Sequence, residues 1–238
     1  MRHRVAHRGY SAVAPENTLP AFAAAVSGGA TIVEFDVRTT LDGVRVIIHD
    51  RMLERTTTGV GPVWEADFSS VRDLDAGAWF SPAYAGVRVP TLAETIDLIA
   101  PADVELLLEI KPPATPDQVK VILEQVAARG LLDRTIVQSF DPAVVGMVPP
   151  DVRRGLLRLR LEPDTPALAK SLGVVLCNPS VADFFDKTDT IAELMAAGVE
   201  IMPWTANDPA RWPSLAEAGV AGLITDRVAE LTGWALPR

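Results

Sequence analysis

Reactive polar residues of the N-terminal quarter of the chain are concentrated between His7 and Asp50. Two of the three histidines, His7 and His49, lie in this stretch, and each follows an apolar run. Histidine takes up and releases protons near neutral pH, so two histidines could serve as a general acid and a general base. His3 lies at the start of a predicted strand and is expected to be structural. The pattern therefore predicts proton-transfer chemistry that uses His7 and His49.

Charged residues of both signs lie near the ends of two further apolar runs. Glu34 alternates with Asp36, and Glu109 alternates with Lys111, so each pair shares one face of a strand. Three carboxylates brought together would repel one another, and a divalent cation would relieve that repulsion. An all-oxygen ligand set suits Mg²⁺ or Ca²⁺ better than Zn²⁺. These residues predict a metal site at Glu34, Asp36 and Glu109, with a simple ion pair between Glu109 and Lys111 as the alternative.

Two cationic residues could neutralise an anionic substrate at the same place. Arg8 directly follows His7, and Lys111 follows the apolar run that ends at Ile110. Together with a metal ion they would stabilise charge on the non-bridging oxygens of a phosphate. One histidine would activate the attacking oxygen while the other protonates the leaving alcohol. The combination favours cleavage of a phosphodiester.

The elements that must position these residues follow a parallel α/β pattern. Strand-like runs alternate with helix-length segments along the whole chain. Nine strands are predicted, at residues 3–7, 31–37, 44–49, 104–110, 135–139, 154–159, 173–177, 199–203 and 222–225. Helices are predicted at residues 16–27, 91–99, 116–129, 190–197 and 208–218. The helix at 91–99 opens with a capping box formed by Thr91 and Glu94.

The second and third predicted strands are separated by only the segment from Arg38 to Gly43. A parallel crossover needs a dozen or more residues, so the two strands must form an antiparallel hairpin. Asp42-Gly43 is typical of a two-residue hairpin loop. A loop of that length would place Asp36 opposite His49.

Once this hairpin arm is set aside, eight parallel strands remain, which is the number that closes a (β/α)8 TIM barrel. In such a barrel the active site lies where the strands end, and the polar residues described above follow or end predicted strands. The segment from about residue 51 to residue 90 lacks clear periodicity and is too long for a simple barrel loop. They are predicted to form an inserted lid or subdomain after the second strand and its hairpin arm.

Composition and charge exclude several classes of partner. The chain has 238 residues, 48% of them hydrophobic, which fits one barrel domain covering residues 1–238. A net charge of −9 and a pI near 4.8 disfavour nucleic acid or an anionic membrane surface as partners. No segment reaches the ~18 apolar residues of a membrane span, and the first residues lack the apolar core of a secretory signal. We therefore expect a soluble, cytoplasmic protein that acts on a small molecule.

Short motifs recur in a fixed order along the chain. They are His7-Arg8-Gly9, Pro15-Glu16-Asn17-Thr18, Glu34-x-Asp36, Asp42-Gly43, His49-Asp50, Leu74-Asp75-Ala76-Gly77, Pro90-Thr91-Leu92, Glu109-Ile110-Lys111, Ser139-Phe140 and Trp204-Thr205. In this order they resemble the glycerophosphodiester phosphodiesterase family, over residues 7 to 226. One departure is Val228, which stands after Thr225-Asp226-Arg227 where members commonly have proline.

The resemblance implies a TIM barrel with an insertion after the second strand, and hydrolysis of glycerophosphodiesters to glycerol 3-phosphate and an alcohol. It implies that His7 and His49 are the acid/base pair, and that Glu34, Asp36 and Glu109 bind Ca²⁺ or Mg²⁺. The residues to which it assigns substrate binding are Arg8, Lys111, Trp204, Phe140 and Glu16. A carboxylate such as Glu16 near a helix N-terminus also has an ordinary structural explanation.

Two alternative functions remain open at this point. In a lyase-type reaction a hydroxyl of the substrate would attack the phosphorus and give a cyclic phosphate, with nearly the same residues. A non-catalytic phosphate-ester binding protein on the same barrel would bind its ligand without turnover. The presence of both histidines, three carboxylates and Lys111 disfavours the binding protein.

Overall fold

The computed structural model describes residues 1–236, and every predicted strand is present in it. The strands are β1 (His3–Ala6), β2 (Ile32–Thr39), β3 (Arg45–Ile47), β4 (Glu105–Ile110), β5 (Thr135–Ser139), β6 (Arg153–Arg158), β7 (Leu176–Pro179), β8 (Glu200–Ile201) and β9 (Gly222–Thr225). The helices are α1 (Leu19–Ser27), α2 (Phe68–Arg72), α3 (Leu92–Ile99), α4 (Pro116–Ala127), α5 (Pro142–Met147), α6 (Thr165–Leu172), α7 (Val181–Asp186), α8 (Thr188–Ala196), α9 (Trp212–Glu217) and α10 (Val228–Ala235). Within this part of the chain, no helix is both long and apolar enough to cross a bilayer.

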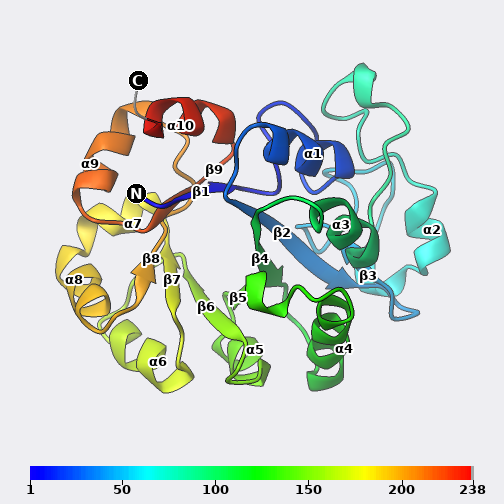
Figure 1. Ribbon diagram of the computed structural model, residues 1–238. Coiled ribbons are helices and arrows are strands. Elements are labelled where there is room, and N and C mark those ends of the chain that lie inside the picture. The colour runs from blue at the N-terminus through cyan, green and yellow to red at the C-terminus, as the bar shows by residue number, and fades with distance from the viewer. Residues whose placement is uncertain (237–238) are drawn as a thin grey trace.

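Eight of the strands form one parallel sheet in the order β8-β7-β6-β5-β4-β2-β1-β9. The gap between the end strands β8 and β9 is bridged by three backbone hydrogen bonds, from Ala221 N to Ile201 O (2.9 Å), from Ile224 N to Pro203 O (3.1 Å) and from Ala206 N to Ile224 O (2.8 Å). Helices surround this ring of strands (Figure 1). The predicted TIM barrel is therefore confirmed.

Apolar side chains fill the inside of the ring, as they do in other barrels of this kind. Val5, Ile32, Leu107, Ile136 and Ile224 belong to this inner cluster and are buried. Two larger clusters lie between the strands and the surrounding helices, so the strands are buried on both faces and read as nearly continuous apolar runs. Because the barrel is packed rather than hollow, a substrate can bind at an end of the barrel but not inside it.

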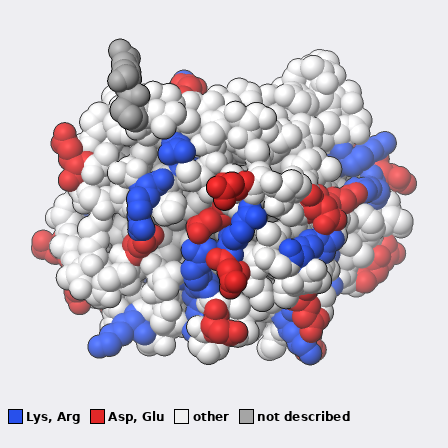
Figure 2. Space-filling model, viewed as in Figure 1, with Lys and Arg blue, Asp and Glu red and all other residues white. Residues whose placement is uncertain are grey.

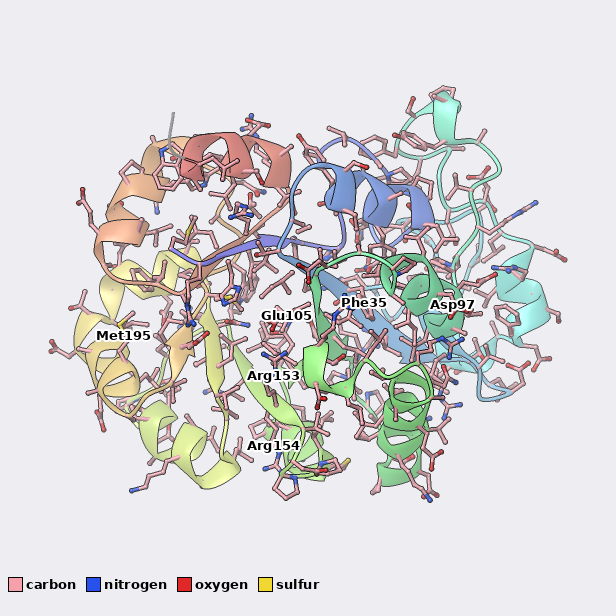
Figure 3. The ribbon with its side chains drawn as sticks, in the orientation of Figure 1. Phe35, Asp97, Glu105, Arg153, Arg154 and Met195 are labelled. Atoms are coloured by element: carbon pink, nitrogen blue, oxygen red, sulfur yellow. The ribbon has the colours of Figure 1, made fainter. Side chains whose placement is uncertain are left out.

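The end at which the strands begin carries an ordinary charged surface. Glu105 begins β4 and Arg153 begins β6, and the two form an ion pair at 3.1 Å. Figure 3 shows both near the centre of the ring, and in Figure 2 acidic and basic side chains are interspersed across the middle of this face. The histidines, carboxylates and cations that could take part in a reaction lie at the other end of the barrel, where the strands finish.

The hairpin of β2 and β3 is present, but its predicted register is wrong by one residue. Thr40 N donates to Val44 O (3.0 Å) and Gly43 N donates to Thr40 O (3.0 Å), so the loop holds three residues rather than two. Gly43 has a φ of +83°, which glycine adopts at little steric cost. As a result Asp36 lies opposite Ile48 and not opposite His49. The Ile48 N–H donates to the Asp36 carbonyl at 3.0 Å.

Helix α1 begins three residues later than predicted, at Leu19 instead of Glu16. Asn17 has a φ of +57° and Thr18 is extended, so neither can belong to a right-handed helix. The predicted helix at 208–218 is divided into a 3₁₀ turn at Pro209–Arg211 followed by α9. The predicted capping box of Thr91 and Glu94 is confirmed.

Residues 51–90 contain α2 and two 3₁₀ turns, and they lie beside α3 and β3 at one side of the ring (Figure 1). They enclose a small apolar cluster of their own, formed by Val46, Ile48, Leu53, Val63, Val71, Ala76 and Val89. The cluster includes residues of β3 and its extension, so the insertion is anchored on the hairpin arm. Its role as a lid stays a prediction.

An ion pair joins this insertion to the barrel. Arg72 of α2 contacts both carboxylate oxygens of Glu94 in α3, with Nη1 2.9 Å from Oε2. The hydrogen bonds from Arg72 lower the pKa of Glu94 from 4.5 to about 2. Glu94 therefore stabilises the folded state fully above its unfolded pKa, and this contribution is lost as the pH falls through about 2.

We predict that Glu94→Gln lowers the free energy of unfolding at pH 7 by up to about 1 kcal/mol, because both side chains of the pair are partly exposed. Glutamine preserves the capping box, so the charge alone is removed. Urea titrations should show that the difference in the free energy of unfolding between wild type and variant narrows as the pH is lowered from 4.5 towards 2. A difference that does not change with pH would contradict a stabilising ion pair between Arg72 and Glu94. Glu65→Gln, at an exposed glutamate without an ion pair in residues 1–236, is the control.

Candidate active site

His7 directly follows β1, and its ring is held by a carboxylate from the end of the chain. Its Nδ1 lies 2.6 Å from Asp226 Oδ1, and Asp226 also accepts hydrogen bonds from Ser11 Oγ (3.0 Å) and Asn207 Nδ2 (2.5 Å). Burial opposes ionisation of Asp226, but the hydrogen bond and charge of His7 outweigh it and lower the pKa to about 2. An ionised carboxylate only accepts hydrogen bonds, so Nδ1 is the nitrogen of His7 that donates to Asp226, and Nε2 has no hydrogen bond within residues 1–236.

His49 follows β3 and is held in a similar way by its neighbour in sequence. Its Nδ1 lies 2.7 Å from Asp50 Oδ1, while its backbone carbonyl accepts hydrogen bonds from Arg38 Nε (2.9 Å) and Nη2 (2.7 Å). Burial lowers the pKa of His49 from 6.5, and the positive charges of Lys111 and Arg8 lower it further against the opposing charge of Asp36. The His49 ring is therefore largely neutral at pH 7.

Three buried carboxylates form a cluster at the end of β2 and β4. Asp36 pairs in register with Glu109, and one oxygen each of Glu34, Asp36 and Glu109 lies within 4.8 Å of the others. Burial raises the pKa of Glu34 and Glu109, and the nearby Asp36 carboxylate raises both further, that of Glu109 to about 8. Burial would also raise the pKa of Asp36, but the charges of Lys111 and Arg8 hold it well below its ordinary range.

Two cations and an amide contact this cluster. Lys111 Nζ lies 3.0 Å from Asp36 Oδ1 and 2.7 Å from Glu109 Oε1. Arg8 Nε lies 3.4 Å from Asp36 Oδ2, and the Arg8 backbone N–H donates to Glu34 Oε2 at 2.8 Å. Arg8 has a φ of +56°, an uncommon conformation for arginine that brings its backbone N–H to Glu34. The cluster is thus partly neutralised by the protein itself.

Asn17 holds the central carboxylate from the other side. Its Nδ2 donates to Asp36 Oδ2 at 2.7 Å, and its Oδ1 accepts from the Asp36 backbone N–H at 3.2 Å. This exchange requires the left-handed conformation of Asn17, which asparagine adopts more readily than most residues. The Pro15-Glu16-Asn17-Thr18 motif therefore contributes two contacts to the site, from Asn17 to Asp36 and from Glu16 to Arg8.

A cavity of about 410 Å³ opens at this end of the barrel. Its lining combines the charged groups with Gln138 and with an apolar wall formed by Phe140, Leu157, Trp204 and Ile224. The rings of Phe140 and Trp204 meet edge to face at 5.4 Å, and Trp204 Nε1 donates to Asn178 O at 2.9 Å. The cavity can therefore hold a ligand with an anionic part and a less polar part.

The structure brings nearly all the predicted site residues to this cavity. Those that line it are His7, Arg8, Glu34, His49, Glu109, Lys111, Phe140 and Trp204. Asp36 lies beneath them with 1% of its surface exposed. Glu16 does not line the cavity: its Oε1 accepts from Arg8 Nη1 at 2.8 Å, so it contacts the residue predicted to bind phosphate.

Besides Asn17, four residues at or next to the site had no role predicted from the sequence. Asp226 and Asp50 hold the two histidines, Arg55 contacts Asp50, and Gln138 lines the cavity next to Glu109 in the sheet. Asp226 follows the last strand and Asp50 follows His49, so the two aspartates could have been predicted from their positions after strands. Arg55 follows no strand, and its position in the sequence did not indicate a role.

Two histidines line one cavity together with an arginine and a lysine, and this combination suits the hydrolysis of a phosphate ester. With the parallel barrel that carries them, they define a TIM-barrel hydrolase of phosphate esters. Comparison with known proteins narrows this class. The model of the glycerophosphoryl diester phosphodiesterase family matches residues 7–230. The chain belongs to this family and is a phosphoric diester hydrolase.

Individual relatives agree with the family assignment. The chain is 34% identical over 234 residues to a glycerophosphodiester phosphodiesterase of Caldanaerobacter subterraneus subsp. tengcongensis, with 93% of each chain covered. It is similar in structure to a phosphodiesterase of Oleispira antarctica solved in complex with its product sn-glycerol-3-phosphate, with a TM-score of 0.90, 27% identity, and 96% of this chain and 94% of that chain covered. A glycerophosphodiester phosphodiesterase from Agrobacterium tumefaciens gives a TM-score of 0.85 at 30% identity, covering 98% of this chain and all of that one (100%).

The contact between His7 and Asp226 predicts which ring nitrogen of His7 carries the proton. Nitrogen NMR of the histidine rings should show His7 protonated at Nδ1 in its neutral form, because the ionised carboxylate accepts from that atom. Asp226→Asn removes the charge, and the preference for Nδ1 should weaken. An unchanged tautomer in this variant would show that Asp226 does not set it. His3, which has no side-chain hydrogen bond within residues 1–236, provides the internal control.

Proposed function

We propose that this protein hydrolyses glycerophosphodiesters to glycerol 3-phosphate and an alcohol, with two histidines as acid and base and with a bound divalent cation, Mg²⁺ or Ca²⁺. The observation that carries the proposal is the single cavity of about 410 Å³ that both histidines, Arg8 and Lys111 line together. The complex of the Oleispira antarctica neighbour with sn-glycerol-3-phosphate supports the choice of substrate.

The carboxylate cluster fits a divalent cation. Glu34, Asp36 and Glu109 offer only oxygen ligands, and their atoms lie within the 4.8 Å that one ion can span. Burial and mutual repulsion raise the pKa of Glu34 and Glu109, which indicates that Lys111 and Arg8 alone do not neutralise the cluster. Glu34, Asp36 and Glu109 would therefore hold the ion. When bound, it would act as a Lewis acid on a phosphate oxygen.

The protein side chains supply the other parts of the reaction. Arg8 and Lys111 bind the phosphodiester anion and stabilise the charge that develops on its oxygens. One of His7 and His49 takes a proton from water through its free Nε2, and the water oxygen attacks the phosphorus. The bond from phosphorus to the alcohol oxygen breaks, and the other histidine gives that oxygen a proton.

The apolar wall of the cavity receives the remainder of the substrate. Phe140 and Trp204 contact the glycerol or the alcohol group, and Lys111 Nζ lies 5.7 Å from the centre of the Phe140 ring. The amine is thereby placed between the carboxylates and the aromatic wall. Glu16 contributes indirectly, because it contacts Arg8 and does not reach the cavity.

We predict that His7→Ala and His49→Ala each lower kcat by at least about 100-fold, because general acid or base catalysis contributes that much. His3→Ala is the matched control, since His3 begins β1 at the opposite end of the barrel. Phosphorus NMR with glycerophosphocholine and glycerophosphoethanolamine measures turnover and identifies the product. Near-normal turnover in either site variant would contradict the acid/base roles, and a lasting cyclic phosphate would indicate the lyase-type reaction.

Removal of metal should abolish activity, and addition of Mg²⁺ or Ca²⁺ should restore it. Calorimetric titration with each ion should show that Glu34→Gln weakens binding by at least about 10-fold, because one of three carboxylate ligands is lost. Glu105→Gln, at the opposite end of the strand that carries Glu109, should leave the affinity unchanged. Full activity after exhaustive chelation would remove the metal from the mechanism.

A further inference from the structure

The insertion contributes a side chain to the site that the reaction described above does not use. Arg55 lies in the segment 51–90, and its guanidinium group contacts two carboxylates at once. Its Nε and Nη2 atoms donate to Asp50 at 2.5 and 3.1 Å, and its Nη1 and Nη2 atoms donate to Glu16 at 2.8 and 2.7 Å. One planar group therefore joins two residues that lie far apart in the sequence.

Each of these two carboxylates holds a residue of the active site. Asp50 Oδ1 lies 2.7 Å from His49 Nδ1, and Glu16 Oε1 accepts from Arg8 Nη1 at 2.8 Å. An unbroken series of hydrogen bonds thus runs from His49 through Asp50, Arg55 and Glu16 to Arg8. Arg55 is the central member of this series and the one that the insertion supplies.

We propose that Arg55 is a positioning residue for phosphodiester hydrolysis, through which the insertion fixes His49 and Arg8 relative to each other. The inference rests on the proposed function, because it assumes that His49 transfers a proton and that Arg8 binds the phosphate. Arg55 itself does not line the cavity, so it acts through Asp50 and Glu16.

The charges around Arg55 explain why its loss would weaken substrate binding. Glu16 and Asp50 carry two negative charges, and Arg8 and Arg55 carry two positive ones. The Glu16 side chain is only 13% exposed, so solvent screens its charge weakly. Without Arg55, the carboxylate of Glu16 would draw the Arg8 guanidinium towards itself and repel an anionic substrate.

The geometry explains why proton transfer would suffer as well. Arg55 holds both oxygens of Asp50, one through Nε and the other through Nη2. This two-point contact fixes the plane of the carboxylate that orients the His49 ring. A lysine would keep the charge but could not reproduce a planar fork that satisfies two carboxylates together.

Steady-state kinetics of Arg55→Ala, Arg55→Lys and Arg51→Ala with glycerophosphocholine test the proposal. We expect Arg55→Ala to lower kcat/KM by about 10- to 100-fold, through both a lower kcat and a higher KM. Arg55→Lys should recover part of the increase in KM and little of kcat. Arg51→Ala should match wild type, because Arg51 is exposed in the same insertion and forms no ion pair among residues 1–236.

The double variant Arg55→Ala with Glu16→Gln separates positioning from a merely structural role. Removing the uncompensated carboxylate should return KM towards the wild-type value while kcat stays low, since Asp50 still lacks its partner. A merely structural role predicts no recovery of KM. Wild-type values in Arg55→Ala, or an unrecovered KM in the double variant, would overturn the proposal. Absence of turnover by the wild-type protein would instead contradict the proposed function, because the role of Arg55 is read only against an active wild type.

Discussion

Electrostatic repulsion among three buried carboxylates is the constraint on which the rest of the site depends. Glu34, Asp36 and Glu109 are each less than 5% exposed, and one oxygen of each lies within 4.8 Å of the others. Charges buried so closely are tolerated only where compensating charges and hydrogen bonds surround them. Lys111 and Arg8 supply part of the compensating charge, and both also line the cavity, where an anionic substrate can contact them. A chain with a net charge of −9 thus still presents two cations to a phosphodiester.

The two histidines share one arrangement with different partners. Each has its Nδ1 within 2.7 Å of an aspartate oxygen. The aspartate of His7 accepts from neutral donors, Ser11 and Asn207, whereas the aspartate of His49 contacts the cationic Arg55. The two rings consequently have different electrostatic surroundings although they belong to one cavity. Such a difference would suit the opposite proton transfers that we propose for the two histidines.

The barrel and the insertion have separate parts in building the site. The barrel brings the ends of β1, β2, β4 and β9 together, so that residues from both ends of the sequence meet around His7 and Asp226. Its interior is filled with apolar side chains, which separates the candidate site from the charged groups at the opposite end. The insertion rests on the hairpin arm and carries Arg55 to Glu16. A segment outside the repeating β/α pattern thus contacts residues that hold the site in place.

The sequence by itself determined the strands, the eight-stranded barrel and most of the polar residues that line the cavity, because buried parallel strands are continuous apolar runs and the polar groups of the site follow them. It did not determine the hairpin register, since Asp42-Gly43 is compatible with loops of two or three residues and only the pairing of Thr40 with Val44 decides between them. The partners of the histidines and of Arg8 were likewise decided by the tertiary structure. Asp226 reaches His7 across 219 positions of the chain and Arg55 reaches Glu16 across 39, and no local pattern encodes contacts between residues so far apart.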